Sequence, residues 1–330
     1  MTSRHSDGTV TLVVMLAILW AAPAADAADP INYRLKWLFN ASVVGDLYAD
    51  VNGHFADARL AVKVKSGGPE RDAIKELELG QAQFGVASAD QVIRALDKGA
   101  PVVVLAQIFQ VNPLQWIYRR SDPPINQLAD LKGRVIGITY GGNDETIMRT
   151  LLAQAGLAEP EVTLFNVRYD YTPFYRRQVD IWPVYRNTQG IIIGRKMQAE
   201  NEPVQFFIPG EFGVRFVANS VVTSRRMLQN EPATVKRFIH ALLAGWEAAL
   251  DPANTARALD TLQQFDRDTP RERLAEQLDI TRTLIKPTAA LKIGTIDTAA
   301  WKQTEQIMLT QKQIGKPVQV ETVLHPEIAF

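Results

Sequence analysis

The chain has 330 residues, of which 46% are hydrophobic, and its 36 basic residues balance 36 acidic residues. This length predicts two domains with hydrophobic cores, and the balanced charge disfavours a nucleic-acid partner or a basic membrane-binding surface. Cysteine is absent, which excludes disulfides, thiolate metal sites, a cysteine nucleophile and a lipid-modified N-terminal cysteine.

The N-terminus reads as a secretory signal. An apolar run at residues 10–22 follows the basic Arg4, is shorter than the ~18 to 20 residues of a membrane span, and leads into small residues. Residues 25–27, Ala-Asp-Ala, fit the cleavage rule, with a second match at residues 22–24. We expect residues 1–27 to be removed on export; the alternative is a buried N-terminal helix.

The first segment beyond the signal is "LKWLFNASVVG", residues 35–45, which reads as the end of a short apolar strand. The apolar residues include Trp37, and an amide follows at Asn40. An indole can stack on a flat ligand and an amide can hydrogen-bond its edge. The segment is therefore a candidate for ligand binding; in the alternative interpretation Trp37 fills the core of its domain, as aromatic side chains more often do.

Strand and helix patterns alternate in the segments that follow. Residues 59–68 alternate apolar and polar residues, which predicts a strand, and a helix is expected from Pro69 to a stop at Gly80. Residues 84–88 predict a strand that leads into a helix, and residues 101–109 form an apolar run typical of a sheet buried on both faces. The alternation predicts helices on both sides of a largely parallel sheet.

A second set of strands and helices comes next. Residues 133–139 predict a strand, and residues 143–156 predict a helix capped by Asn143 or Asp144. Further strands are expected at residues 162–167, 178–185 and 203–209. From Pro232 onward, apolar residues recur at helical spacing, so we expect the C-terminal third to be helical and to pack onto the first domain.

Signals for catalysis are missing from the sequence. The four histidines lie far apart and form no short-range metal-binding pattern. The motifs G-x-S-x-G, G-x-x-x-x-G-K-[ST] and G-x-G-x-x-G are all absent. We therefore expect no metal, no cofactor and no catalytic residue.

The order of the segments resembles that of a known family. The segments that carry the resemblance are "LKWLFN", "SGGPERDAIKELELGQAQFGVASADQVIRALDKGAPVVVLAQI", "ADLKGRVIGI", "QVDIWPVYRN" and "NSVVTSRRMLQNEPATVKRFIHALLAGWEAALDP". Together they look like the periplasmic substrate-binding proteins of ABC importers, in the branch that covers thiamine pyrimidine precursors, sulfonates and nitrate. The resemblance extends over nearly the whole mature chain.

The resemblance implies a two-lobed α/β periplasmic binding protein fold of type II, with the ligand between the lobes at the carboxyl ends of the strands. Residues 28–120 and 222–330 would form the first lobe, and residues 121–221 the second. Two crossings are expected near Tyr118–Asp122 and Val217–Val222, and rotation about them would close the cleft. The protein, a soluble periplasmic monomer, would then dock on a membrane permease.

Candidate ligand-binding residues follow from the ends of the equivalent strands. They are Trp37, Asn40, Ser66, Gly67, Ser88, Asp90, Trp116, Tyr140, Gly142, Asn143, Asp144, Trp182, Tyr185 and Glu211. Backbone N–H groups in "TYGGND" suit an anion or a carbonyl, although the same glycines can form only a turn. Asp144 and Glu145 would repel an anion, so we expect a neutral or cationic planar heterocycle such as a thiamine pyrimidine precursor.

Other ligands stay open. Pyrimidine-precursor binders tend to carry an acidic residue where this chain has Gln189. Arg119, Arg120 or Arg186 turned into the cleft would favour an anion such as a sulfonate, nitrate or an aromatic acid.

An enzyme is the remaining alternative, because the fungal enzyme that makes the thiamine pyrimidine looks distantly similar. Its lysine and histidine align with Ala87 and Gln91 here, and its cysteine-rich loop has no counterpart in a chain without cysteine. We therefore expect a binding protein rather than an enzyme.

Overall fold

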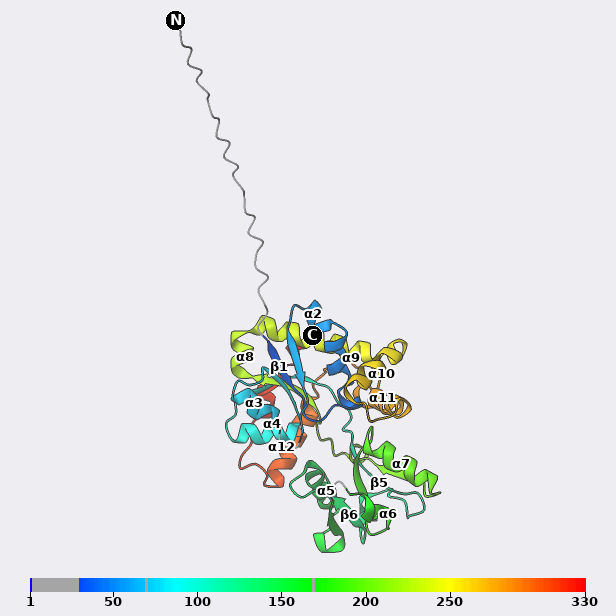
Figure 1. Ribbon diagram of the computed structural model, residues 1–330. Coiled ribbons are helices and arrows are strands. Elements are labelled where there is room, and N and C mark those ends of the chain that lie inside the picture. The colour runs from blue at the N-terminus through cyan, green and yellow to red at the C-terminus, as the bar shows by residue number, and fades with distance from the viewer. Residues whose placement is uncertain (2–29, 69–70, 168–169) are drawn as a thin grey trace.

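The computed structural model describes residues 1, 30–68, 71–167 and 170–330. The predicted signal peptide, residues 1–27, lies outside the described residues except for Met1. The described chain forms two lobes, with the first above the second in Figure 1. Each lobe has its own sheets and its own hydrophobic core, so the predicted two-lobed α/β fold is confirmed.

The first lobe is built on a five-stranded mixed sheet. Its strand order is β2 (Val62–Lys65), β1 (Ile31–Arg34), β3 (Phe84–Ala87), β10 (Ser220–Ser224) and β4 (Val102–Gln107). β1 pairs parallel with β2 and β3, as the βα alternation predicts. β10 runs antiparallel to β3 and β4 because the chain re-enters this lobe from the second one. The sheet is therefore less parallel than expected.

The second lobe contains a three-stranded sheet and a two-stranded sheet. The first has the order β8 (Trp182–Tyr185), β5 (Leu114–Arg119) and β9 (Val204–Phe207), and the second pairs β6 (Val135–Ile138) with β7 (Thr163–Asn166). A parallel bridge between Ile136 and Ile181 joins the two. β6, β7 and β8 run in the same direction, so their carboxyl ends meet at one edge.

The first crossing between the lobes lies earlier in the chain than expected. β5 pairs with β8 and β9, so it belongs to the second lobe and the crossing runs through residues 108–113. The expected crossing at Tyr118–Asp122 instead covers the end of β5 and the turn after it. The second crossing comprises residues 213–219 and overlaps the expected Val217–Val222. An apolar strand carries no local signal of which sheet it will join, which explains the displaced boundary.

The first lobe carries most of the helices. They are α1 (Val44–Val51), α2 (His54–Asp57), α3 (Ala73–Glu78), α4 (Ala89–Asp97), α8 (Arg225–Asn230), α9 (Pro232–Leu250), α10 (Thr255–Phe265), α11 (Arg271–Ile285) and α12 (Thr298–Thr310). α9 packs closely on α1, because Gly245 lies against Ala49 with no room for a Cβ atom. Phe238 of α9 also stacks on Phe84 of β3. No helix in the described part of the chain is long and apolar enough to cross a membrane.

The second lobe has α5 (Asn143–Gln154), α6 (Thr172–Tyr175) and α7 (Gln189–Ala199). Two helix starts differ from the prediction. α3 begins at Ala73 because the Asp72 carboxylate accepts hydrogen bonds from the first-turn N–H groups of Ile74 and Lys75, and the predicted start at Pro69 lies outside the described residues. α5 has Gly142 as its N-cap rather than Asn143 or Asp144.

Candidate ligand-binding site

The loops that follow β1 and β8 face each other across the gap between the lobes. Asn187, just after β8, donates a hydrogen bond of 2.9 Å to the hydroxyl of Ser42, in the short helix η1 (Ala41–Val43) after β1. On the same side, α7 lies below α11 (Figure 1), and Arg195 forms an ion pair of 2.9 Å with Glu272. These contacts place the carboxyl ends of the first-lobe strands opposite those of the second lobe.

A pocket of about 370 Å³ opens at the carboxyl ends of β6, β7 and β8. We call it the second-lobe pocket, and its lining residues are Leu114, Thr139, Asn143, Asp144, Val167, Tyr171, Trp182, Pro183, Val184, Tyr185 and Gln189. Four of the predicted site residues, Asn143, Asp144, Trp182 and Tyr185, are therefore brought together. Its volume lies within the ~300 to 1,000 Å³ typical of small-molecule sites.

Asp144 is the acidic group of the second-lobe pocket. Its carboxylate accepts a hydrogen bond of 2.6 Å from the backbone N–H of Thr139, and the residue is 5% exposed. Burial raises the pKa of Asp144, and the hydrogen bond from Thr139 opposes that rise. Among the described lining residues of this pocket, none is Arg, Lys or His. The pocket therefore suits a neutral or cationic group better than an anion.

Two exposed aromatic side chains stand at strand ends of the two lobes. Trp37 follows β1 in the first lobe and is 36% exposed, and Tyr140 follows β6 in the second lobe and is 54% exposed. Leu38, beside the indole, is also exposed. Trp37 therefore does not fill the core of its lobe, and both rings are available to a flat ligand.

The loop that carries Trp37 is held by the loop after β2. The N–H of Gly67 donates a hydrogen bond of 2.8 Å to the carbonyl of Trp37. A Cβ atom on Gly67 would lie 2.2 Å from the carbonyl oxygen of Leu35, so only glycine allows this approach. The Ser66 carbonyl accepts a hydrogen bond from Arg34. Ser66 and Gly67 thus support the Trp37 loop through their backbone.

Asn40 has a local role. Its side-chain oxygen accepts a hydrogen bond of 2.8 Å from the Ser42 N–H, which caps η1, and its amide donates to the Leu38 carbonyl. The prediction that this amide is directed at the ligand gains no support from this geometry, because both ends of the amide are already bonded within the loop.

Three other predicted site residues serve the structure of their own lobe. Trp116 is fully buried and donates a hydrogen bond of 3.0 Å to the Gly137 carbonyl, so it belongs to the core of the second lobe. The Ser88 hydroxyl donates to the Asp90 carboxylate at 2.5 Å, and Asp90 pairs with Arg94 one turn later on α4. Strand-end position alone did not distinguish these residues from those that line the second-lobe pocket.

A second cavity, of about 360 Å³, lies between the two crossings. We call it the hinge cavity. Most residues of the segments 107–115 and 208–217 line it, together with Ile147, Arg186, Asp297 and Ala300. Glu211, in the short helix η4 (Pro209–Phe212), is the predicted site residue found there. Leu114 lines both this cavity and the second-lobe pocket, so the two adjoin.

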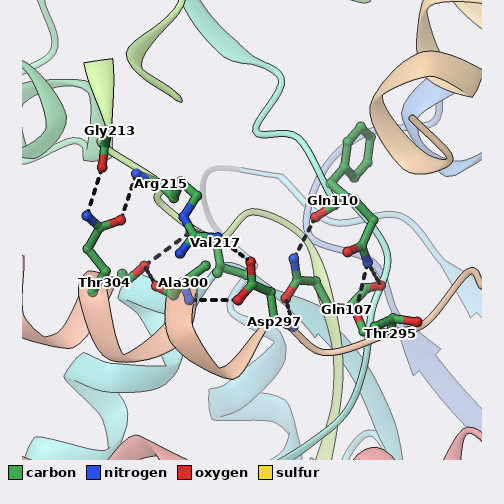
Figure 2. A network of polar contacts seen from close by, with 11 residues as sticks. Gln107, Gln110, Gly213, Arg215, Val217, Thr295, Asp297, Ala300 and Thr304 are labelled. Carbon is green, nitrogen blue, oxygen red and sulfur yellow. Dashed lines mark hydrogen bonds and ion pairs between the residues drawn. The ribbon is translucent and has the colours of Figure 1, made fainter. Parts of the chain in front are cut away.

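Polar contacts tie both crossings to the start of α12 (Figure 2). Asp297 forms an ion pair of 2.8 Å with Arg215 of the second crossing, and its N–H donates to the Gln107 side chain at the end of β4. The Gln110 amide donates to the carbonyl of Thr295 at 2.8 Å. The segment ahead of α12 therefore anchors both crossings to the first lobe.

The three arginines singled out from the sequence have different surroundings. Arg119 is buried in the second lobe, where it pairs with Glu202 at 2.9 Å and lies over the ring of Phe174. Arg120 is exposed beyond the end of β5 that lies farthest from the crossing. Arg186 lies over the ring of Phe206 and lines the hinge cavity. Only the last of these three arginines reaches a cavity between the lobes.

Several residues that line the two cavities were not among the predicted site residues. Thr139 and Tyr171 follow strands that were predicted, so their positions at strand ends could have indicated them. Gln189, noted only because an acidic residue was expected there, lines the second-lobe pocket, and its side-chain oxygen accepts from the Thr188 hydroxyl at 2.6 Å. Gln115 lies within an apolar strand, and no motif marks it.

The two α/β lobes, the paired crossings and the cavities beside them define a class of structure, the periplasmic binding protein fold. The periplasmic aliphatic sulphonate binding protein SsuA from Escherichia coli has the same fold, with a TM-score of 0.71 and 15% identity over 90% of this chain and 92% of that one. The chain belongs to the NMT1/THI5-like family, whose model matches residues 40–256. The family resemblance expected from the sequence is confirmed.

Named relatives of similar length bind different heterocycles. The chain is 27% identical to the riboflavin-binding protein RibY of Chloroflexus aurantiacus, over 91% of this chain and 87% of that protein. It is 23% identical to the formylaminopyrimidine-binding protein of Halalkalibacterium halodurans, over 93% and 95% of the two chains. The fold also occurs in an enzyme, the desulfurization enzyme DSZB, with a TM-score of 0.62 and 15% identity over 91% and 97%.

Proposed function

We propose that this chain is the solute-binding component of an ABC importer and that it captures a small planar heterocycle between its lobes. The observation that carries the proposal is the second-lobe pocket, which has aromatic walls and a buried carboxylate, with no basic side chain among its described lining residues. The relatives named for riboflavin and formylaminopyrimidine support the same ligand class. In this proposal the protein is a periplasmic monomer after loss of residues 1–27, and it delivers the ligand to a membrane permease.

Recognition would combine stacking with hydrogen bonds to the ring edge. Trp37 and Tyr140 supply one exposed ring from each lobe, so closure about the two crossings would bring both against the ligand. Asn143 and Asp144 supply the amide and carboxyl groups of the pocket. An aminopyrimidine edge matches these two side chains, because its amino group can donate to the carboxylate and its ring nitrogen can accept from the amide.

An anionic ligand is the second candidate, and one residue favours it. Arg186 lines the hinge cavity and carries a positive charge close to the second-lobe pocket. A sulfonate, nitrate or an aromatic acid would need such a guanidinium. The acidic Glu211 in the same cavity opposes this alternative.

We propose binding without catalysis, although enzymes such as DSZB use the same fold and fold alone does not decide activity. The support comes from the relatives, two of which are named as binding proteins.

A thermal-shift panel tests the ligand class, because a ligand that binds only the folded state raises its melting temperature. The panel comprises a formylaminopyrimidine, riboflavin, taurine, an alkanesulfonate and nitrate. We expect at least one heterocycle to give a larger shift than any of the anions. A shift with an anion alone would overturn the proposal and favour the second candidate.

A further inference from the structure

One fully buried amide side chain that lines the hinge cavity has unused hydrogen-bonding groups. Gln115 lies on β5, lines the hinge cavity and is fully buried. Neither its amide nitrogen nor its amide oxygen has a hydrogen-bond partner within residues 30–68, 71–167 and 170–330. Buried polar side chains are normally hydrogen-bonded, so an amide in this state requires an explanation.

The other amides around the hinge cavity are occupied. The Gln107 side chain donates to the Phe109 carbonyl and accepts from the Asp297 N–H. The Asn112 side chain donates to the Phe216 carbonyl and accepts from the Leu114 N–H. These bonds join the crossings to each other and to α12, so these side chains have structural roles. Gln115 differs because it contributes no such contact.

A leucine at position 115 would stabilise the folded protein more than the glutamine does. The neighbouring Ile117, on the same face of β5, packs in an apolar cluster with Val184 of β8. An amide buried there without a partner destabilises the fold, whereas an apolar side chain of similar size does not. The amide is therefore better explained by a partner outside the chain.

The charges around the cavity indicate a neutral partner. Arg186 and Glu211 carry opposite charges, and Arg215 is paired with Asp297 at 2.8 Å. The four charges balance, so the cavity offers no net attraction to a charged group. A carboxamide both donates and accepts, and its natural partners are hydroxyl and amide groups.

We propose that Gln115 binds a neutral hydroxyl- or amide-bearing substituent of the ligand, which extends from the second-lobe pocket past Leu114 into the hinge cavity. This inference rests on the proposed function and narrows its ligand class to a heterocycle with a polar, uncharged tail. Gln115 is then a specificity-determining residue, because the ring alone does not reach it.

The experiment compares riboflavin with lumiflavin, which has the same ring system but a methyl group in place of the hydroxylated tail. Wild type, Gln115→Leu and the control Gln306→Leu are titrated with both flavins, and the melting temperature of each ligand-free variant is measured. Gln306 is exposed on α12 and lines neither cavity.

We expect wild type to bind riboflavin more tightly than lumiflavin, and Gln115→Leu to weaken riboflavin binding by roughly 5- to 50-fold while lumiflavin binding changes little. The ligand-free Gln115→Leu protein should melt at the same temperature as wild type or higher, which separates lost recognition from lost folding. Gln306→Leu should behave as wild type with both flavins.

Two outcomes overturn the inference while the proposed function stands. In the first, Gln115→Leu binds both flavins as tightly as wild type does, which means that the Gln115 amide forms hydrogen bonds with water and not with the ligand. In the second, the wild-type protein binds both flavins equally, or it binds neither flavin and binds an aminopyrimidine without the formamido group as tightly as the formylaminopyrimidine. Failure of every heterocycle to bind would overturn the proposed function and the inference with it.

Discussion

The side chain of Asn187, in the second lobe, donates a hydrogen bond of 2.9 Å to the hydroxyl oxygen of Thr281 in α11 of the first lobe. Both residues are fully buried, and the same Asn187 amide reaches Ser42. A buried polar contact stabilises the lobe orientation in which it forms, because separation would leave polar groups without these partners. Asn187 therefore connects the loop after β8 to two elements of the opposite lobe.

Replacing Asn187 with alanine should loosen this side of the cleft. We expect small-angle scattering to give a larger radius of gyration for the ligand-free variant than for wild type. Affinity for the heterocycle that gives the largest thermal shift should fall by about 1 to 2 kcal/mol, because closure becomes less favourable. Asn230→Ala, at an exposed position on α8, is the control. Unchanged scattering together with unchanged affinity would contradict this role of Asn187.

Replacing Trp37 with alanine should remove one face of the ligand site without unfolding the lobe. We expect ligand affinity to fall by about 1 to 3 kcal/mol, because a stacking ring is lost, while the melting temperature of the ligand-free protein changes little.

Trp182→Ala is the matched comparison for Trp37→Ala, since this indole is 1% exposed and packs against Phe174. Its truncation should cost about 3 to 5 kcal/mol of unfolding free energy. A large drop in melting temperature for Trp37→Ala would mean that the indole is part of the core after all.

Asp144→Asn tests the electrostatics of the second-lobe pocket. The asparagine side chain has the same shape as the aspartate and can still accept the hydrogen bond from the Thr139 N–H, but it carries no negative charge. We expect titration calorimetry to give about tenfold weaker binding of a protonated aminopyrimidine and equal or stronger binding of taurine. The control is Asp279→Asn, at an exposed position on α11, which should leave the affinity for both ligands unchanged. Weaker binding of both ligands by Asp144→Asn would indicate a structural defect instead.

Asp46 should make the stability of the first lobe depend on pH. It is buried on α1 and accepts a hydrogen bond of 2.6 Å from the Tyr33 hydroxyl. Burial raises the pKa of Asp46 to about 7, although the bond from Tyr33 lowers it. Between about pH 4 and pH 7 the folded state holds a proton that the unfolded chain has released, so the free energy of unfolding falls as pH rises and then levels off.

Asp46→Asn removes this proton, so denaturant unfolding of the two proteins across pH isolates the effect. We expect the variant to gain stability relative to wild type as pH rises from about 4 to about 7, by up to about 4 kcal/mol. Below that range the difference between the proteins should be constant. A constant difference across the whole range would show that Asp46 ionises normally in the folded protein.

The local elements were predictable because their signals come from residues a few positions apart. The predicted strand at residues 133–139 contains β6, and the predicted helix at residues 143–156 contains α5. Glycine at position 156 ends the latter in the left-handed conformation, at φ +68°. The strand-end rule also indicated Trp37 and Asp144, because the carboxyl ends of neighbouring strands meet wherever the strands run in parallel.

The tertiary structure alone decided which of these residues are buried in a core and which line a cavity. β5 could have continued the first sheet, but its pairing with β8 and β9 moved the crossing to residues 108–113. That pairing buries Trp116 in a core and places Gln115 in the lining of the hinge cavity, although the two residues are neighbours in sequence. Contacts between residues close in sequence determine the local helices and strands. Burial depends on which strands pair from distant parts of the chain, and no local pattern encodes that pairing.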